Sequence, residues 1–372
     1  MPTQKNDIFA FDGNGIGILF SKPDQKWKIN EGVFIAAGNI AVASEFEKSK
    51  LINKGELFSN NVGVIFTKDD SNFINKKEGS ILSGRGVEFS NGSTIDKGSV
   101  ENHGVIRGLN DYGVVAEDVT KFELSNYGKI VGTEIGAAFD SILEKGPKVE
   151  NEGLIKSIGP GENAAVYMND SSDVKLTVIN KADGTIEGLY SIVVDDGRLD
   201  LKNHGKLKGD VILDSTGKSD KIINKGDIKG QVFLGSGDDT YKNKDGKAGK
   251  IFSQDGNDKL TAGNSKDKFA FIGPLDAATN VDRIKEFESG KDKFFLDQNV
   301  FTALTGPGGL ESSEFRKSKN AKDNDDFMLY HKNSGRLWYD ADADGVGGKV
   351  LIARLDEGQK LNADDFEVAL FA

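Results

Sequence analysis

Apolar and polar residues alternate in short runs along most of the chain. In the run from Gly63, Val64 and Phe66 alternate with Ile65, and the same spacing recurs at Val87 and Phe89. Runs of this length that are rich in β-branched residues are typical of strands and too short for helices. Because alternate strand residues share a face, we predict that Val64, Phe66, Val87 and Phe89 point into a core.

A second pattern, apolar-x-Asn-x-Gly-x-apolar with small variations, recurs along the first two thirds of the chain. Its Asn residues are Asn30, Asn53, Asn75, Asn102, Asn126, Asn151, Asn180, Asn203, Asn224 and Asn243. Their spacings suit single coils of a parallel β-helix, which stack about 4.8 Å apart. Asn tolerates tight corners, and its amide can bond to the equivalent Asn of the next coil. We therefore predict an all-β, right-handed parallel β-helix of about ten coils with an Asn ladder.

Composition removes several classes of function. The 372 residues include no Cys and three His, with 48 basic and 59 acidic residues and a net charge of −11. Disulfides, thiolate catalysis, Cys-ligated zinc and iron–sulfur clusters are excluded, and no HExxH motif is present. A bound metal would be a hard cation. Basic residues are interspersed with acidic ones and form no basic stripe, so we expect neither nucleic-acid nor membrane binding.

Beyond the last full Asn repeat, the pattern changes to Gly and Asp. Residues 234–241, 253–260 and 262–269 fit G-G-x-G-x-D-x-U-x with some losses, and they contribute the candidate ligands Gly235, Gly237, Asp239, Asp255, Asp258 and Asp267. Gly-rich turns expose carbonyl oxygens, and one Asp per turn adds the charge that Ca²⁺ requires. Since Asp239 and Asp258 are 19 residues apart, we expect their turns to stack and to form one site. A plain continuation of the β-helix is the alternative.

These segments resemble the nonapeptide repeats of the RTX (repeats-in-toxin) family, in which a β-roll holds Ca²⁺. Residues 231–372 further resemble the C-terminal region of serralysin-type proteins, through segments at 267–271, 282–293, 310–315 and 337–345. The resemblance implies a bacterial protein that is exported by a type I secretion system and folds with calcium outside the cell.

The two ends of the chain fit that expectation. Residues 1–20 lack the features of an N-terminal secretory signal. The acidic-then-apolar ending, residues 364–372, is similar to uncleaved C-terminal secretion signals of the family. Alternatively, Phe366, Val368 and Leu370 form a final edge strand.

A second acidic segment lies near the C-terminus. Asp340, Asp342 and Asp344 precede Gly345 with the spacing of the first half of an EF-hand loop, but Leu351 stands where the bidentate Glu belongs. The segment is therefore either a weak Ca²⁺ site or an acidic hairpin turn between strands at 337–339 and 349–353.

Together these patterns predict four regions: an N-terminal cap at 1–28, a parallel β-helix at 29–233, an RTX-like calcium-binding β-roll at 234–271, and a serralysin-type C-terminal region with the secretion signal at 272–372. The expected function is a secreted, calcium-binding, non-enzymatic β-solenoid that attaches to a surface, host or matrix. Its expected partners are calcium, the type I exporter and an extracellular glycan or host surface.

An enzymatic alternative remains, because parallel β-helices followed by RTX modules also occur among polysaccharide lyases and epimerases that act on uronic-acid glycans. The candidate catalytic residues lie on the longer coils: Asp111, Tyr112, Asp118, Lys121, Glu162, Asn163, Tyr167 and Asp170.

Overall fold

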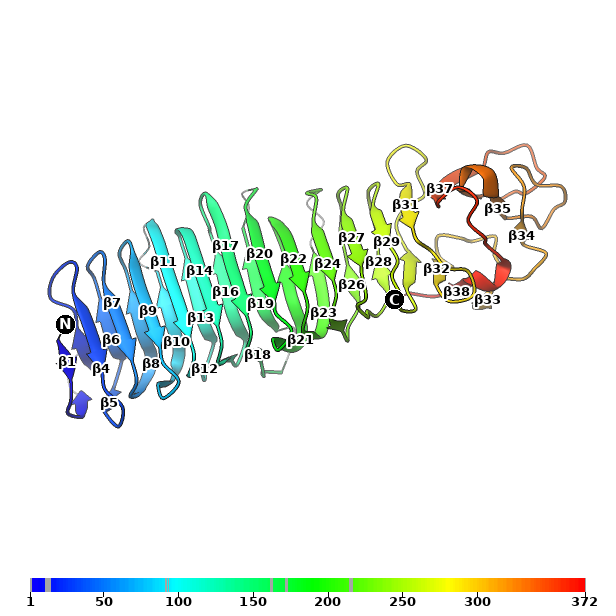
Figure 1. Ribbon diagram of the computed structural model, residues 1–372. Coiled ribbons are helices and arrows are strands. Elements are labelled where there is room, and N and C mark those ends of the chain that lie inside the picture. Colours follow the sequence, from blue (N-terminus) through cyan, green and yellow to red (C-terminus); the bar gives the residue numbers. More distant parts are fainter. Residues whose placement is uncertain are drawn as a thin grey trace. The chain divides into compact units, whose positions relative to one another are not determined.

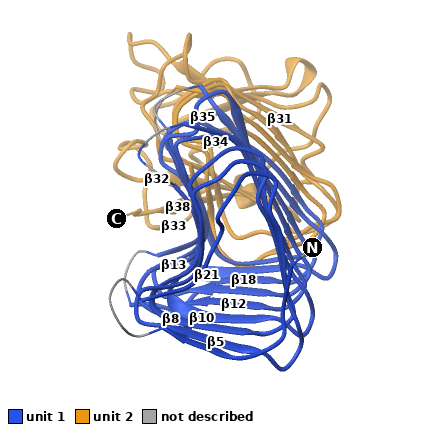
Figure 2. Ribbon diagram, turned by 90° about the vertical axis from the view of Figure 1, so that its left-hand side faces the viewer, with its two compact units in different colours: residues 1–211 blue, residues 212–372 orange. Residues whose placement is uncertain are grey.

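The protein is an all-β parallel solenoid of about 12 turns with 2% helix. The computed structural model describes residues 2–10, 15–90, 92, 94–160, 163–170, 173–213 and 217–371. The chain forms two compact units, residues 1–211 and 212–372 (Figure 2). The fold class predicted from the sequence is confirmed. There are more turns than the ten predicted because some lack the Asn-x-Gly signal, such as the turn of β1 (Thr3–Gln4), which pairs in parallel with β4 (Lys26–Ile29).

Unit 1 consists of two sets of strands that alternate along the chain. One set, which carries the repeated Asn residues, is β1, β4, β7 (Lys50–Asn53), β9 (Ser71–Asn75), β11 (Ile95–Asn102), β14 (Val119–Asn126), β17 (Lys145–Asn151), β20 (Lys175–Asn180) and β22 (Arg198–Asn203). The other set is β2 (Ile8–Ala10), β3 (Ile16–Leu19), β5 (Phe34–Ala37), β6 (Ile40–Ser44), β8 (Glu56–Phe66), β10 (Ser80–Phe89), β12 (Val105–Gly108), β13 (Tyr112–Glu117), β15 (Lys129–Gly132), β16 (Ile135–Asp140), β18 (Leu154–Ser157), β19 (Ala164–Asn169), β21 (Thr185–Val194) and β23 (Lys206–Leu213), whose last residues belong to unit 2. Figure 1 shows β7, β9, β11 and β14 as consecutive rungs.

Unit 2 repeats this arrangement with shorter strands and a more elaborate end. Its first set is β24 (Lys221–Asn224), β27 (Thr240–Asn243), β29 (Lys259–Thr261), β31 (Asp282–Lys285), β34 (Phe315–Arg316), β35 (Met328–His331), β36 (Arg336–Tyr339) and β37 (Val350–Arg354). Its second set is β25 (Asp227–Ile228), β26 (Val232–Phe233), β28 (Ile251–Phe252), β30 (Lys268–Phe271), β32 (Lys293–Asp297), β33 (Gly308–Gly309) and β38 (Phe366–Ala369). Two short 3-10 helices, Lys332–Ser334 and Ala363–Asp365, complete it.

Stacked apolar side chains fill the inside of unit 1. The four predicted inward residues, Val64, Phe66, Val87 and Phe89, are all fully buried. Strand register places Val87 on Val64 and Phe89 on Phe66, and the two phenyl rings lie 5.0 Å apart. The predicted register of these strands is therefore confirmed.

The Asn side chains form a continuous hydrogen-bonded ladder through unit 1. From Asn53 through Asn180, each Nδ2 donates to the Oδ1 of the next ladder Asn, at 2.8–3.0 Å. The Asn126 amide, for example, donates to Asn151 Oδ1 at 2.8 Å and to the Leu154 carbonyl at 3.1 Å. An amide supplies both a hydrogen-bond donor and an acceptor. The buried Asn side chains can therefore form hydrogen bonds with one another along the ladder and need no water.

Part of the C-terminal segment belongs to the fold of unit 2. Strand β38 pairs in parallel with β32, and Phe366 and Val368 are buried whereas Leu370 is 62% exposed. The alternative of a structural strand is thus confirmed for Phe366 and Val368, but its edge position is wrong, because β33 pairs with β38 on its other side. Residue 372 lies outside the described residues.

Candidate functional site

The Gly- and Asp-rich turns of unit 2 stack on one another as their spacing predicted. Ser236 and Asp255 form a parallel bridge, and the Gly237 amide donates to the Asp255 carbonyl at 2.9 Å. Gly256 has φ 128°, and a Cβ there would lie 1.9 Å from the Gly237 carbonyl oxygen. Only glycine fits this close stack of turns.

A column of buried carboxylates lies beside these turns. Each Asp backbone N–H donates to the carboxylate of the next turn: Asp220 to Asp239 at 2.7 Å, Asp239 to Asp258 at 2.8 Å and Asp258 to Asp282 at 3.1 Å. The residues Asp239, Asp258 and Asp282 are each 1% exposed. We call these three residues the Asp column.

The bonds within the Asp column satisfy only one oxygen of each carboxylate. The Oδ2 atoms of Asp239, Asp258 and Asp282 are buried and accept no hydrogen bond from the described residues. Burial, with a smaller contribution from neighbouring carboxylates, chiefly Asp220, raises the pKa of Asp239 to about 8. Burial, followed by the charge of Asp282, likewise raises the pKa of Asp258, and burial raises the pKa of Asp282. The column must therefore take up protons or a cation to be stable.

The donor set suits a hard cation, but its arrangement is a line. Carboxylate oxygens are ligands that Ca²⁺ accepts, and the turns beside them offer backbone carbonyls. Among the described residues, however, no three His, Cys, Asp or Glu side chains converge as a metal-binding group. If calcium is bound here, Asp239, Asp258 and Asp282 would hold it, and its role would be to neutralise the column.

Two other predicted ligands lie away from the Asp column. Asp267 continues the Asn ladder of unit 2 instead, because its carboxylate accepts hydrogen bonds from Asn243 Nδ2 at 2.5 Å and from the Gly263 amide at 2.7 Å. Both of its oxygens are thus occupied. The side chain of Asp255 is exposed. Gly235 and Gly237 form the stacked turns through their backbones and have positive φ values of 81° and 129°.

The acidic segment near the C-terminus is the turn of an antiparallel hairpin between β36 and β37, which was one of the two predicted alternatives. Asp342 Oδ2 accepts the Gly347 amide at 2.6 Å. Burial, followed by Asp342, raises the pKa of Asp340. Asp344 is exposed. The Asp342 carboxylate therefore stabilises the turn by accepting a hydrogen bond from a backbone amide of the same turn.

The sequence did not single out Asp282 as a ligand, although it begins the segment 282–293 named above. The spacing from Asp239 to Asp258 is 19 residues, whereas that from Asp258 to Asp282 is 24. Because the second coil is longer, the spacing that relates Asp239 to Asp258 does not extend to Asp282. A search for Asp two residues before a buried apolar residue of each short strand finds all three, but it also finds others, such as Asp267 and Asp292.

The enzymatic candidates in unit 1 are only partly brought together. Arg85 pairs with Asp111 at 3.1 Å, pairs with Glu88 at 3.2 Å and lies over the Tyr112 ring. Lys121 lies on β14, in the other strand set, and pairs with Glu123.

The second group of enzymatic candidates gives one clear contact. Tyr167 donates its hydroxyl to Asp195 at 2.5 Å, and burial, followed by that bond, raises its pKa. Asp118 occupies a corner with φ 55°. Asn163 is partly exposed and Asp170 is buried. Glu162 lies outside the described residues.

Within the described residues, no helix has the length and apolar character needed to cross a membrane.

Comparison of the chain with protein-family models, curated proteins and solved structures found no match. What is established is the β-solenoid with its Asn ladder, and the RTX resemblance rests on the residues named above.

Proposed function

We propose that the protein is a secreted, non-enzymatic β-solenoid that binds calcium in unit 2 and serves in attachment to a surface, host or matrix. The observation that carries the calcium part is the set of three buried carboxylate oxygens that lack hydrogen-bond donors in the Asp column. A fold does not keep three such acids without a compensating partner.

Calcium is the favoured partner because the ligands are hard oxygens and stacked Gly-rich turns flank them. The ligands are Asp239 and Asp258, as the sequence predicted, together with Asp282. Binding couples to folding, since the unfolded chain holds no such column. Calcium at about 100 times its dissociation constant would stabilise unit 2 by about 2.7 kcal/mol.

Attachment is favoured over catalysis by the state of the tyrosines on unit 1. A lyase or epimerase needs a base that loses its proton near neutral pH. Burial, followed by the charges of Asp111, Glu134 and Glu117, raises the pKa of Tyr112. The pKa of Tyr167 is raised as well. Both phenols therefore stay protonated near neutral pH and do not serve as that base.

The test is a calorimetric titration of the chelator-treated protein with calcium. Wild type is expected to bind, and Asp258→Ala is expected to lose most of that binding because it interrupts the Asp column. Asp255→Ala is the matched control, since Asp255 lies in the adjoining turn with an exposed side chain. No heat of binding in wild type, or equal loss in the two variants, would refute the calcium site.

Export is tested with the whole chain, because removal of residues 364–372 would also remove the buried Phe366 and Val368. The chain is produced in cells with and without a matching type I exporter. We expect it in the medium only when the exporter is present, and removal of residues 1–7 should leave export intact. Retention of folded protein in exporter-positive cells would contradict the proposal.

A further inference from the structure

A row of basic side chains crosses the outer face of the first strand set of unit 2. Paired strands align these positions one after another: Lys221, Thr240, Lys259, Arg283, Arg354, Arg336 and His331. Directly paired residues share a face of the sheet. Six strand spacings of about 4.8 Å make the row about 29 Å long. We call these seven residues the basic row.

The basic row contains no acidic residue and is open to solvent. Lys221, Lys259, Arg283, Arg336 and Arg354 are all exposed. Of the ion pairs among the described residues, only that of Arg283 with Asp356, at 3.3 Å, involves a member of the row. Both partners of that pair are exposed, so it is weak and easily exchanged.

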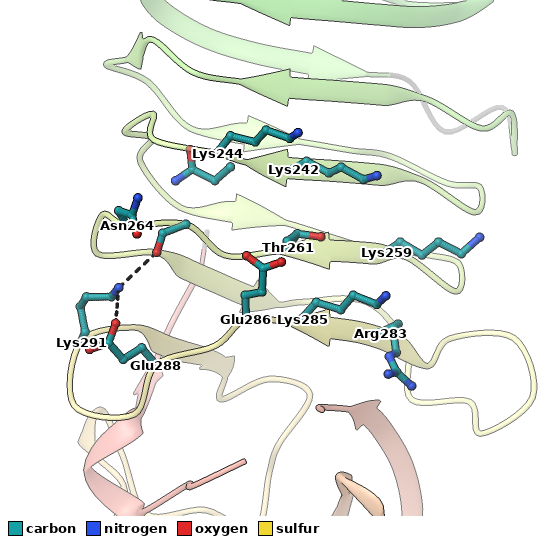
Figure 3. A pocket seen from close by; sticks show the side chains of 12 residues that line it. Lys242, Lys244, Lys259, Thr261, Asn264, Arg283, Lys285, Glu286, Glu288 and Lys291 are labelled. Carbon is teal, nitrogen blue, oxygen red and sulfur yellow. Dashed lines mark hydrogen bonds and ion pairs between the residues drawn. The ribbon is translucent and has the colours of Figure 1, made fainter. Parts of the chain in front are cut away.

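A second, parallel row widens the basic surface. Lys242, Thr261 and Lys285 align on β27, β29 and β31. Lys259 and Arg283 of the basic row, together with the second row, line a groove of about 870 Å³ that has six basic and two acidic lining residues (Figure 3). In Figure 3, Lys242, Lys259 and Lys285 extend from neighbouring strands over the same face. The expectation that the chain forms no basic stripe is therefore wrong for unit 2, because strand pairing gathers residues that lie far apart in the sequence.

We propose that the basic row binds a linear acidic polysaccharide. The inference deepens the proposed attachment function by naming its ligand class, and it rests on that function. Arg283, Arg354 and Arg336 stand on three consecutively paired strands. A guanidinium group binds carboxylate or sulfate through two parallel hydrogen bonds. A row of such groups on successive strands suits a polymer that carries one anionic group on each sugar.

The surroundings of the row disfavour other polyanions. Single-stranded nucleic acids need several aromatic platforms for their bases. The described residues that line the groove include no aromatic residue, and the partly exposed ring of Trp338, on the same strand face as Arg336, has the Lys349 ammonium over it. A membrane surface would favour apolar side chains beside the charges, yet the groove presents Glu286 and Glu288 there.

The test compares two variants that lose the same charge. The row variant is Lys259→Gln with Arg336→Gln and Arg354→Gln. The control variant is Lys26→Gln with Arg107→Gln and Lys129→Gln, all exposed positions of unit 1. Fluorescence titrations use short oligogalacturonates, a sulfated oligosaccharide of equal length, a neutral malto-oligosaccharide and duplex DNA. The carboxylated and sulfated ligands separate the two sources of anionic charge.

Wild type is expected to bind at least one acidic oligosaccharide in a salt-sensitive way and to leave the neutral one unbound. The row variant should bind about tenfold more weakly, which corresponds to about 1.4 kcal/mol, and the control variant should stay within about twofold. Melting curves verify that both variants fold. Absence of acidic-glycan binding, equal weakening in both variants, or duplex DNA binding as tight as glycan binding would overturn the inference.

Calcium binding of the row variant is measured in parallel, so that the two proposals fail separately. Glycan binding without calcium binding would refute the calcium proposal and support the row. Calcium binding without glycan binding would refute the row and leave the calcium site in place.

Discussion

The two units differ in the polar side chains that stack inside them: unit 1 has an amide ladder, whereas unit 2 has a column of carboxylates in addition to a short amide ladder of its own. In unit 1, each ladder amide donates to the next and accepts from the one before, as Asn102 does with Asn126 and Asn75. In unit 2, Asp239, Asp258 and Asp282 have no donor to offer, so the backbone satisfies one oxygen and the other stays unpaired. An amide ladder is complete by itself, whereas a carboxylate column depends on solution conditions.

The outer faces of the two units also differ in the charge of their side chains. In unit 1, the residues that stand three positions before each ladder Asn are a mixture of basic, acidic and neutral types. They are Lys50, Asn72, Ser99, Glu123, Lys148, Thr177 and Asp200. Its charges are partly neutralised locally, as in the Lys121–Glu123 pair at 2.6 Å. The equivalent row of unit 2 is basic. Unit 1 thus has the features of a scaffold, and unit 2 has those of a ligand-responsive end.

The largest expected effect comes from placing a carboxylate in the amide ladder. Asn126→Asp removes the donor to Asn151 and to the Leu154 carbonyl and buries a charge. Unit 1 should lose about 5 kcal/mol of unfolding free energy at pH 8. Chemical denaturation followed by Trp27 fluorescence, in a Trp338→Phe background, measures the loss. A loss of unfolding free energy below about 1 kcal/mol would contradict the proposed difference between the amide ladder and the Asp column.

A variant that removes a core side chain gives a reference value for the loss of stability expected from Asn126→Asp. Phe89→Ala leaves a cavity between the rings of Phe66 and Phe122, which lie 5.0 and 5.1 Å from it. The expected loss is about 3–5 kcal/mol, and it should be independent of pH. The same denaturation experiment measures it. A loss below about 0.5 kcal/mol would mean that the side chain is not in the core.

The reverse exchange should produce a smaller gain in unit 2. Asp258→Asn keeps the oxygen that accepts the Asp239 amide and replaces the unpaired oxygen with a donor beside Asp282. Without calcium at pH 9, unit 2 should gain about 1–2 kcal/mol, because one buried charge is removed. Trp338 fluorescence in a Trp27→Phe background reports this. Destabilisation under those conditions would contradict the account.

The sequence predicts the solenoid well because its evidence is local and repeated. Each ladder Asn stands in its own Asn-x-Gly corner, and the inward side of Phe66 and Phe89 follows from simple alternation. The stacking of Asp239 on Asp258 follows from a coil-length spacing.

The errors arise where a residue type does not reveal its position in the coil. Asp267 has the same side-chain shape as Asn and occupies a ladder position, which counting nonapeptides could not distinguish from the Asp column. The basic row depends on β36 and β37 joining β31, a pairing between residues more than 50 positions apart in the sequence. No local pattern predicts such a contact.

The most direct test of the Asp column is the melting of unit 2 against pH, with chelator and with calcium, followed by Trp338 in the Trp27→Phe background. The folded pKa of Asp239 is about 8, whereas its unfolded value is about 3.9. Its contribution is therefore fully present below about pH 4 and is lost as pH rises towards about 8, at about 1.4 kcal/mol per pH unit.

In chelator, the melting temperature of unit 2 should fall steadily between pH 5 and about pH 8, and calcium should restore it most strongly at the upper end of that range. The Asp239→Asn, Asp258→Asn double variant controls for the titrating groups that remain, Asp282 among them, and should lose most of the pH slope and of the calcium response. A melting temperature in chelator with the same pH dependence in wild type and double variant, and no response to calcium in either, would contradict the claim that the buried carboxylates of unit 2 require a proton or a cation.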